Sequence, residues 1–305
     1  MHHLNMIRSP RLFFSLFLSV LLSQGLTPAL AQSSVRGFSV LTAGGAENEA
    51  ADDSSPIVLS TRRPKQGEVL ELTVNGVDAD SEAEFLGNKY KLFPANESGA
   101  YHCLLPVPVV HKPGPAIIKV GTLCTSVTVV DAHYPVQRLT LPKSKNNFDM
   151  AVGEKEAVEG AKATLSPELH WQGNFQLPSK ARISAGFGLR RIVNGKLLDD
   201  YFHSGLDFAG YQGSPIVACA PGKVVLARGG FKLHGNTVAI DHGQGVVSFY
   251  IHMQKLMVKE GDKVAAGKQI GTVGQTGRAN GPHLHFSIYV NQVAANPGQW
   301  FKHSF

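Results

Sequence analysis

Residues 236–253 read NTVAIDHGQGVVSFYIHM, two apolar and β-branched runs that meet at a glycine-rich turn. Such residues favour strands, and glycines between them favour tight turns. The same texture extends outward, with KVVLAR at 223–228, QIGTVG at 269–274 and HLHFSIYV at 283–290. From Trp171 onward no segment of useful length has the helical period. These features predict an all-β unit over residues 171–305.

Short alternating strands are also predicted upstream, between Pro56 and Asp131, in EVLELTV, NKYKLF, AYHCLLPV, AIIKV and CTSVTVV. Turn signals separate them. The pattern predicts a small β-sandwich of immunoglobulin-like type at residues 56–131, with no constellation of catalytic residues. Residues 132–170 then form a connector, in which EKEAVEGAKATL is expected to be one helix ended by Pro167. If only the last unit is catalytic, a chain that starts near Trp171 should keep its activity.

The first residues are typical of a targeting signal. Arg8 and Arg11 precede the apolar run LFFSLFLSVLL, and Ala29-Leu30-Ala31 offers the small residues that a signal peptidase reads. This order predicts a signal peptide at 1–31 and a flexible leader at 32–55. The run is shorter than the roughly 20 residues that span a bilayer. We therefore expect an exported protein, periplasmic or extracellular, with no membrane span after cleavage.

Cleavage after Ala31 would remove Arg8 and Arg11 and no acidic residue, which lowers the formal net charge from +6 to +4. A mildly basic exported protein suits an anionic envelope surface. No basic stretch is interleaved with aromatic residues, so nucleic-acid binding is not expected. A monomer is expected.

Three cysteines are too few, and odd in number, for a disulfide scaffold. Cys103 and Cys124 lie equally far from the Pro113-Gly114 turn, so one simple hairpin would set them opposite each other. A second turn at Gly121-Thr122 would separate them. A bridge between the two cysteines and two separate thiols both stay open. Cys219, within PIVACAPG, is predicted to be a small buried residue.

Histidines near the C-terminal half have spacings that suit a metal site. His203 and Asp207 stand four apart in HSGLD, and His283 and His285 stand two apart in HLH. These spacings put side chains on one face of a strand. Two imidazoles and one carboxylate can hold Zn²⁺ and leave a fourth position open for water. Spacing alone does not decide whether His283, His285 or both would approach the ion.

VVSFYIH adds a further candidate, because alternation places Ser248, Tyr250 and His252 on one face. A histidine at a strand end beside a tyrosine could donate to a developing oxyanion, although a surface histidine would leave the same pattern. His242 is expected to be structural, in a hairpin turn. Three further histidines have no spaced partner, namely His170, His234 and His303.

Residues 183–297 closely resemble the lysostaphin-type (LytM) family of zinc metallopeptidases. The resemblance runs in family order through ISAGFGLRR, HSGLDFAG, GSPIVACAPGKVV, the stretch 236–253, VKEGDKVAAGKQIGTVGQTGRANGPHLHF and a closing Asn296-Pro297. It implies cleavage of peptide bonds in peptidoglycan.

The resemblance also implies the roles of the site residues. One zinc ion per chain would be held by His203, Asp207 and His285. His252 and His283 would be a catalytic pair that does not bind the metal. Tyr250, which fills a frequent tyrosine position of the family, would be a further catalytic residue.

Two other functions fit parts of the chain. Some relatives have lost zinc ligands and activate wall amidases, but every site position is filled here. VKEGDKVAAGKQIGTVG is similar to part of a lipoyl or biotinyl carrier domain, yet GQTGRANG after it has no lysine to modify. The bond cleaved stays open between a D-alanyl–diaminopimelate cross-link and a glycine bridge; the first is favoured because no wall-targeting module is recognised.

Overall fold

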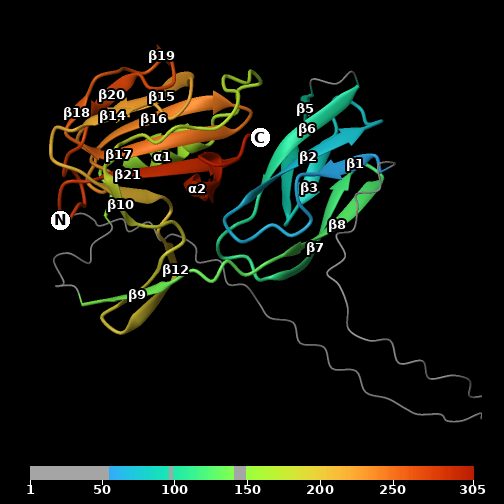
Figure 1. The fold of residues 1–305 in the computed structure, drawn as a ribbon, viewed down its shortest axis with the longest axis horizontal. Coiled ribbons are helices and arrows are strands. Elements are labelled where there is room, and N and C mark those ends of the chain that lie inside the picture. Colours follow the sequence, from blue (N-terminus) through green and yellow to red (C-terminus); the bar gives the residue numbers. More distant parts are fainter. Residues whose placement is uncertain (1–54, 96–98, 141–148) are drawn as a thin grey trace, which may run out of the picture. The chain divides into compact units, whose positions relative to one another are not determined.

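The computed structural model describes residues 55–95, 99–140 and 149–305 (Figure 1). The predicted signal peptide and all of the predicted leader except Ser55 lie outside these ranges. Residues 52–305 form one compact unit, and most of its regular structure is β-strand, as the sequence predicted. Among the described residues, no helix is both long and apolar enough to cross a membrane.

Residues 56–131 form two four-stranded sheets. One has the order β1-β2-β6-β5, with β1 at Ile57–Leu59, β2 at Val69–Asn75, β6 at Ala100–Pro106 and β5 at Phe93–Pro94. The other has the order β4-β3-β7-β8, with β4 at Asn88–Lys91, β3 at Glu82–Phe85, β7 at Gly114–Val120 and β8 at Leu123–Val129. Leu72 of one sheet and Ile118 of the other belong to one buried core. The immunoglobulin-like type of this pair of sheets stays a prediction.

The cysteines of this region do not face each other. Cys103 pairs with Leu72 across β2 and β6, whereas Cys124 pairs with Lys119 across β7 and β8. The hairpin therefore turns at Gly121, and the alternative centred on Pro113-Gly114 is wrong. All three cysteines are free thiols. Cys219 is 1% exposed, as predicted.

The connector contributes two elements to the C-terminal half. Strand β9, Val136–Leu139, pairs in parallel with β11, Arg190–Val193, which also pairs with β12, Lys196–Phe202. Helix α1, Glu154–Lys162, confirms the predicted helix but ends before Pro167. Val158 and Ala161 of α1 pack on Ala239, Val247 and Phe249.

The C-terminal half is built on an eight-stranded sheet of order β10-β13-β21-β17-β16-β15-β19, with β22 paired to β21. Its strands are β10 (Arg182–Ala185), β13 (Leu206–Ala209), β15 (Gly222–Arg228), β16 (Asn236–Gly243), β17 (Val246–Met253), β19 (Lys263–Val264), β21 (Leu284–Val290) and β22 (Val293–Ala295). A small sheet of order β14-β20-β18 accompanies it, formed by β14 (Pro215–Val217), β20 (Gln269–Thr272) and β18 (Lys255–Leu256). The short helix α2 spans Pro297–Trp300.

Both faces of the central strands are covered, which explains why their sequences are apolar almost throughout. Every residue of β17 is buried. Val246 and Tyr250 face the main core with Phe286, while Val247 and Phe249 face helix α1.

Candidate metal centre and active site

Three neighbouring strands place polar side chains at one point of the large sheet. Asp207 of β13 lies opposite His285 of β21, and His285 lies opposite Ile251 of β17. Residues directly opposite each other in antiparallel strands project to the same face. Ile251 continues the Val247 and Phe249 side of β17, so the site shares a sheet face with helix α1.

His203 reaches this point from a turn. The sequence analysis put His203 and Asp207 on one strand, but β12 ends at Phe202 and β13 begins at Leu206. Gly205 lies in the turn, where a Cβ atom would overlap the carbonyl oxygen of Phe286 and the hydroxyl of Ser287. The glycine therefore lets the backbone between the two predicted ligands approach β21 closely.

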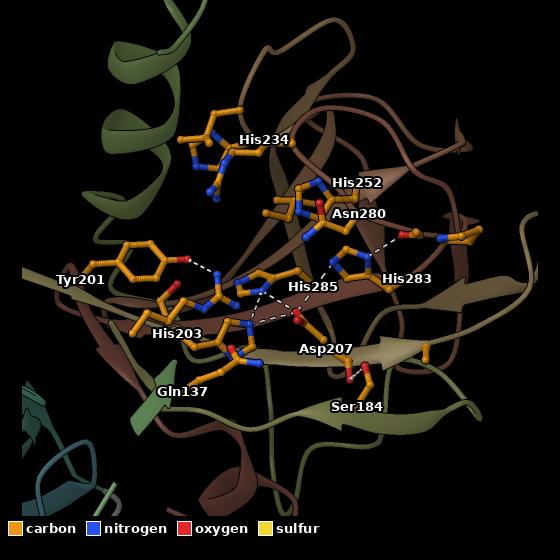
Figure 2. A pocket seen from close by; sticks show the side chains of 18 of the residues that line it. Gln137, Ser184, Tyr201, His203, Asp207, His234, His252, Asn280, His283 and His285 are labelled. Carbon is orange, nitrogen blue, oxygen red and sulfur yellow. Dashed lines mark hydrogen bonds and ion pairs between the residues drawn. The ribbon is translucent and has the colours of Figure 1, made fainter. Parts of the chain in front are cut away.

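Three atoms converge in the site, as Figure 2 shows. His203 Nε2 lies 3.0 Å from Asp207 Oδ1 and 3.0 Å from His285 Nδ1, and His285 Nδ1 lies 2.8 Å from the same carboxylate oxygen. His203 is 4% exposed. These are the three residues that the family resemblance assigned to zinc.

The other ring nitrogens show that this donor set fits a metal ion. His203 Nδ1 lies 2.6 Å from the carbonyl of Gly186, which can only accept, so this nitrogen carries the proton. His285 Nε2 lies 2.8 Å from Ser287 Oγ. The Ser287 hydroxyl can accept a proton from His285 Nε2. In that tautomer, His203 Nε2 and His285 Nδ1 both present lone pairs beside a carboxylate oxygen. Two imidazoles and one carboxylate are a typical catalytic zinc set.

Protonation in the site favours ligation. Burial alone would raise the pKa of Asp207, but hydrogen bonds and charge from His203 and His285 outweigh it and hold that pKa well below its ordinary value. Burial lowers the pKa of His285 despite its bond to Asp207, which favours the neutral ring.

His283 and His252 lie beside this trio. His283 Nδ1 is 2.8 Å from the carbonyl of Gly281, and its Nε2 is 3.9 Å from Asp207 Oδ1. His252 Nδ1 is 2.9 Å from the carbonyl of Thr276, and the His252 and His283 ring centroids are 4.9 Å apart. Both rings therefore carry their proton on Nδ1 and keep Nε2 for other partners.

A β-bulge aims His252 into the site. Between the pairs Tyr250–Val238 and Met253–Asn236, two residues of β17 oppose one of β16. His252 has φ +62°, a conformation that a side chain other than glycine's rarely adopts. Ile251 and His252 consequently both line the cavity. Burial, together with the charges of His285 and His283, lowers the pKa of His252 to about 3.

Tyr250 is not in the site, which corrects its prediction as a catalytic residue. It lies opposite Phe286, on the other face of the sheet from His285, and is 0% exposed. Its hydroxyl accepts hydrogen bonds from the backbone N–H of Cys219 at 2.9 Å and from Ser248 Oγ at 3.1 Å. Simple alternation put Tyr250 and His252 on one face, and the bulge breaks that alternation.

His242 has the structural role that was predicted, though within strand β16 and not in the turn. It is fully buried, its Nδ1 donates to the carbonyl of Pro221 at 2.7 Å, and its Nε2 lies 2.8 Å from Ser248 Oγ. Burial lowers its pKa to about 4, so the ring is neutral.

Sequence reasoning missed His234, which lines the cavity (Figure 2). Its carbonyl accepts the backbone N–H of His252 at 3.0 Å. The signal was available, because a hairpin that turns at residues 243–245 brings the start of the first run beside the end of the second. The connector strand β9 adds Gln137 to the same wall, which no local pattern predicted.

These residues surround a cavity of about 480 Å³. Two guanidinium groups, Arg191 and Arg278, line it, and Asp207 is the one carboxylate among the described lining residues. Arg191 Nη1 donates to Tyr201 Oη at 3.2 Å, and its guanidinium lies 5.4 Å from the centre of that ring. A metal ion would add positive charge, so the cavity suits an anionic ligand.

Known proteins share this region. Residues 201–297 match the model of Peptidase family M23. The chain is 40% identical over 124 residues to peptidoglycan DD-endopeptidase ShyA of Vibrio cholerae, and 40% identical over 116 residues to DD-carboxypeptidase/endopeptidase Mpg of Neisseria meningitidis. These matches cover 40% and 38% of this chain but only 28% and 26% of the relatives' own length.

A solved structure extends the likeness beyond that region. A crystal structure of a peptidase M23 protein from Pseudomonas aeruginosa aligns with a TM-score of 0.59 at 29% identity, over 78% of this chain and 95% of that one. The matched region contains all three residues whose side-chain atoms converge and both neighbouring imidazoles. The chain therefore contains a peptidase family M23 domain of the LytM type.

Proposed function

We propose that this chain is a zinc-dependent endopeptidase that hydrolyses peptide cross-links of bacterial peptidoglycan. The observation that carries the proposal is the convergence of His203 Nε2, Asp207 Oδ1 and His285 Nδ1 within 3.0 Å of one another, beside two further imidazoles. Relatives named as peptidoglycan DD-endopeptidases support the substrate class.

Each residue of the site has a distinct part in the proposed reaction. His203, Asp207 and His285 would hold one zinc ion per chain. Zinc in such a site supplies Lewis acidity and makes hydroxide available near neutral pH. His252 and His283 hold their Nδ1 protons against backbone carbonyls, so each can take a proton at Nε2 and afterwards donate it.

The cavity supports a substrate with free carboxylates. Arg191 and Arg278 can offer planar pairs of N–H donors to a carboxylate. Cross-linked stem peptides of the wall carry such groups. Relatives named peptidoglycan DD-endopeptidase favour a D-alanyl–diaminopimelate cross-link over a glycine bridge. This substrate lies outside the cytoplasmic membrane, so export, directed by the predicted signal peptide, is part of the proposal.

Digestion of purified walls tests the proposal. The zinc-loaded protein is incubated with walls that contain diaminopimelate cross-links and, separately, with walls that contain glycine bridges, and the fragments are weighed. We expect the first to be cut at the cross-link. His285→Ala is the control and should release nothing. A zinc-loaded, folded protein that cuts neither wall would contradict the proposal and favour an amidase-activating role.

A further inference from the structure

Glu154, the first residue of helix α1, is a carboxylate with no exposed surface. It lies outside residues 201–297, the part that matches the peptidase family. A buried carboxylate is costly unless hydrogen bonds or charges compensate it. The groups that bond to Glu154 therefore indicate its role in the structure.

Those partners are the backbone of one loop beside the active site, residues 231–235. Glu154 Oε2 accepts the N–H of Lys232 at 2.8 Å, and Oε1 accepts the N–H groups of Leu233 at 3.0 Å and His234 at 2.9 Å. His234 Nδ1 donates to Oε1 at 2.8 Å. Three successive backbone N–H groups around one anion form a nest, which fixes the backbone dihedrals of the loop.

Helix α1 also holds the start of this loop by packing. Phe231 is 8% exposed and belongs to the same buried cluster as Val158 of the helix. The N–H of Ala151, just before the helix, donates to Glu154 Oε2 at 2.7 Å. The hydrogen bonds hold the pKa of Glu154 near 2, although burial alone would raise it, so the carboxylate stays ionised at neutral pH.

The fixed loop holds His252 and Arg278 through its carbonyl groups. The carbonyl of His234 accepts the backbone N–H of His252 at 3.0 Å, and the carbonyl of Leu233 accepts the N–H of Arg278 at 3.0 Å. His252 has its strained φ of +62° at this point. Such a conformation persists only where its surroundings impose it. The described contacts that impose it include the bond to His234 and the bond of the His252 ring to Thr276.

We propose that Glu154 is a positioning residue for His252, acting through loop 231–235. The carboxylate fixes the loop, the carbonyl of His234 fixes the backbone of His252, and the imidazole is thereby aimed at the cavity. Only the catalytic consequence rests on the proposed function. The ligands His203, Asp207 and His285 do not contact Glu154, so metal binding should not depend on it.

The test compares Glu154→Gln with two variants of the same helix in the zinc-loaded full chain. Glu156→Gln removes an exposed carboxylate from the same first turn. Val158→Ala removes buried packing but leaves the loop bonds in place. For each protein, the zinc content and the thermal midpoint are measured. The kcat, the KM and the hydrogen-exchange rate of the His252 amide are then measured at a temperature well below the lowest thermal midpoint.

We expect Glu154→Gln to keep its zinc and its KM, while kcat falls roughly 10- to 100-fold. The increase in the exchange rate of the His252 amide should be at least ten times larger in Glu154→Gln than in Val158→Ala. Glu156→Gln should match the wild type. If Glu154→Gln does not fold, Glu154→Asp, which keeps the charge but shortens the reach, should show the same direction of change in kcat and in exchange.

Two results would overturn the proposal. One is a wild-type exchange rate of the His252 amide in Glu154→Gln or, where that variant does not fold, in Glu154→Asp. The other is a loss of kcat in Val158→Ala as large as in the Glu154 variant. Amide exchange needs no substrate, so a wild-type protein that cuts no wall would refute the proposed function while the exchange rates still decide the role of Glu154.

Discussion

Each site histidine is anchored through one ring nitrogen, and the anchor decides which nitrogen faces the cavity. His203, His252 and His283 each bond through Nδ1 to a backbone carbonyl and keep Nε2 available. His285 is the exception, because its Nε2 is held by Ser287 and its Nδ1 joins the convergent set. Tautomers set by such outer contacts decide which rings can bind a metal and which can move protons.

Replacing the two histidines of HLH, His283 and His285, should therefore have different effects on zinc binding and on activity. His285→Ala removes one of three proposed ligands, so zinc and activity should both be lost. His283→Ala and His252→Ala should retain zinc, because the ligand trio is intact, while kcat falls roughly 10²- to 10⁴-fold. Zinc per chain and wall hydrolysis are measured in the three variants. A metal-free His283→Ala beside a loaded His285→Ala would reverse the ligand assignment.

Ser287 should affect the affinity of the site for zinc, although it is not one of the proposed ligands. Ser287→Ala removes the hydroxyl that holds His285 Nε2 at 2.8 Å, so zinc should bind roughly 10- to 100-fold more weakly. Ser248→Ala is the matched control, since it breaks a serine–histidine bond in the same sheet at His242. Titration with a zinc-selective chelator compares the affinities. Equal losses in both variants would mean that the effect comes from general loosening of the sheet.

At the level of elements, sequence alternation predicts the strands but not their local breaks. The sequence analysis placed Asp207 and His285 on two strands that could meet, and β13 and β21 do pair there. The bulge at His252 does not, because an inserted residue depends on the partner strand. Tyr250 was misplaced for this reason. His203 was misplaced on a strand because the turn at Gly205 depends on contact with β21.

Helix α1 should carry a pH-dependent part of the stability. The pKa of Glu154 falls from 4.5 to about 2 on folding. A depressed carboxyl pKa contributes stability that is present above pH 4.5 and is lost as the pH falls toward 2. The free energy of unfolding should therefore drop more steeply in the wild type than in Glu154→Gln over this window, by on the order of 1 to 2 kcal/mol. Urea unfolding of the two proteins at several pH values measures it; parallel curves would contradict the assigned pKa.

At the level of the whole molecule, the predicted domain boundary at Trp171 does not separate two independent cores. Val69 and Leu104, from the first two-sheet region, belong to the same buried cluster as Ile288 and Trp300. The Gln299 side chain accepts the N–H of Val69 at 2.9 Å and donates to its carbonyl at 2.8 Å. These partners are 230 residues apart in the chain, so no local pattern could reveal them. Composition and turn signals could predict where the strands lie but not which surfaces they cover.

Truncation tests how much of the chain the active site needs. A chain starting at Trp171 lacks β9, with Gln137 in the cavity wall, and α1, with Glu154 under loop 231–235. Contrary to the expectation from sequence, we expect this chain to lose most of its activity and to unfold at a lower temperature. A chain starting at residue 132 keeps both elements and loses only the cover from the first two sheets. It should bind one zinc ion and hydrolyse wall peptide with a reduced thermal midpoint. The zinc content, the thermal midpoint and the rate of wall hydrolysis of both shortened chains are compared with those of the full chain. If the chain from Trp171 is as active and as stable as the chain from residue 132, the connector is dispensable.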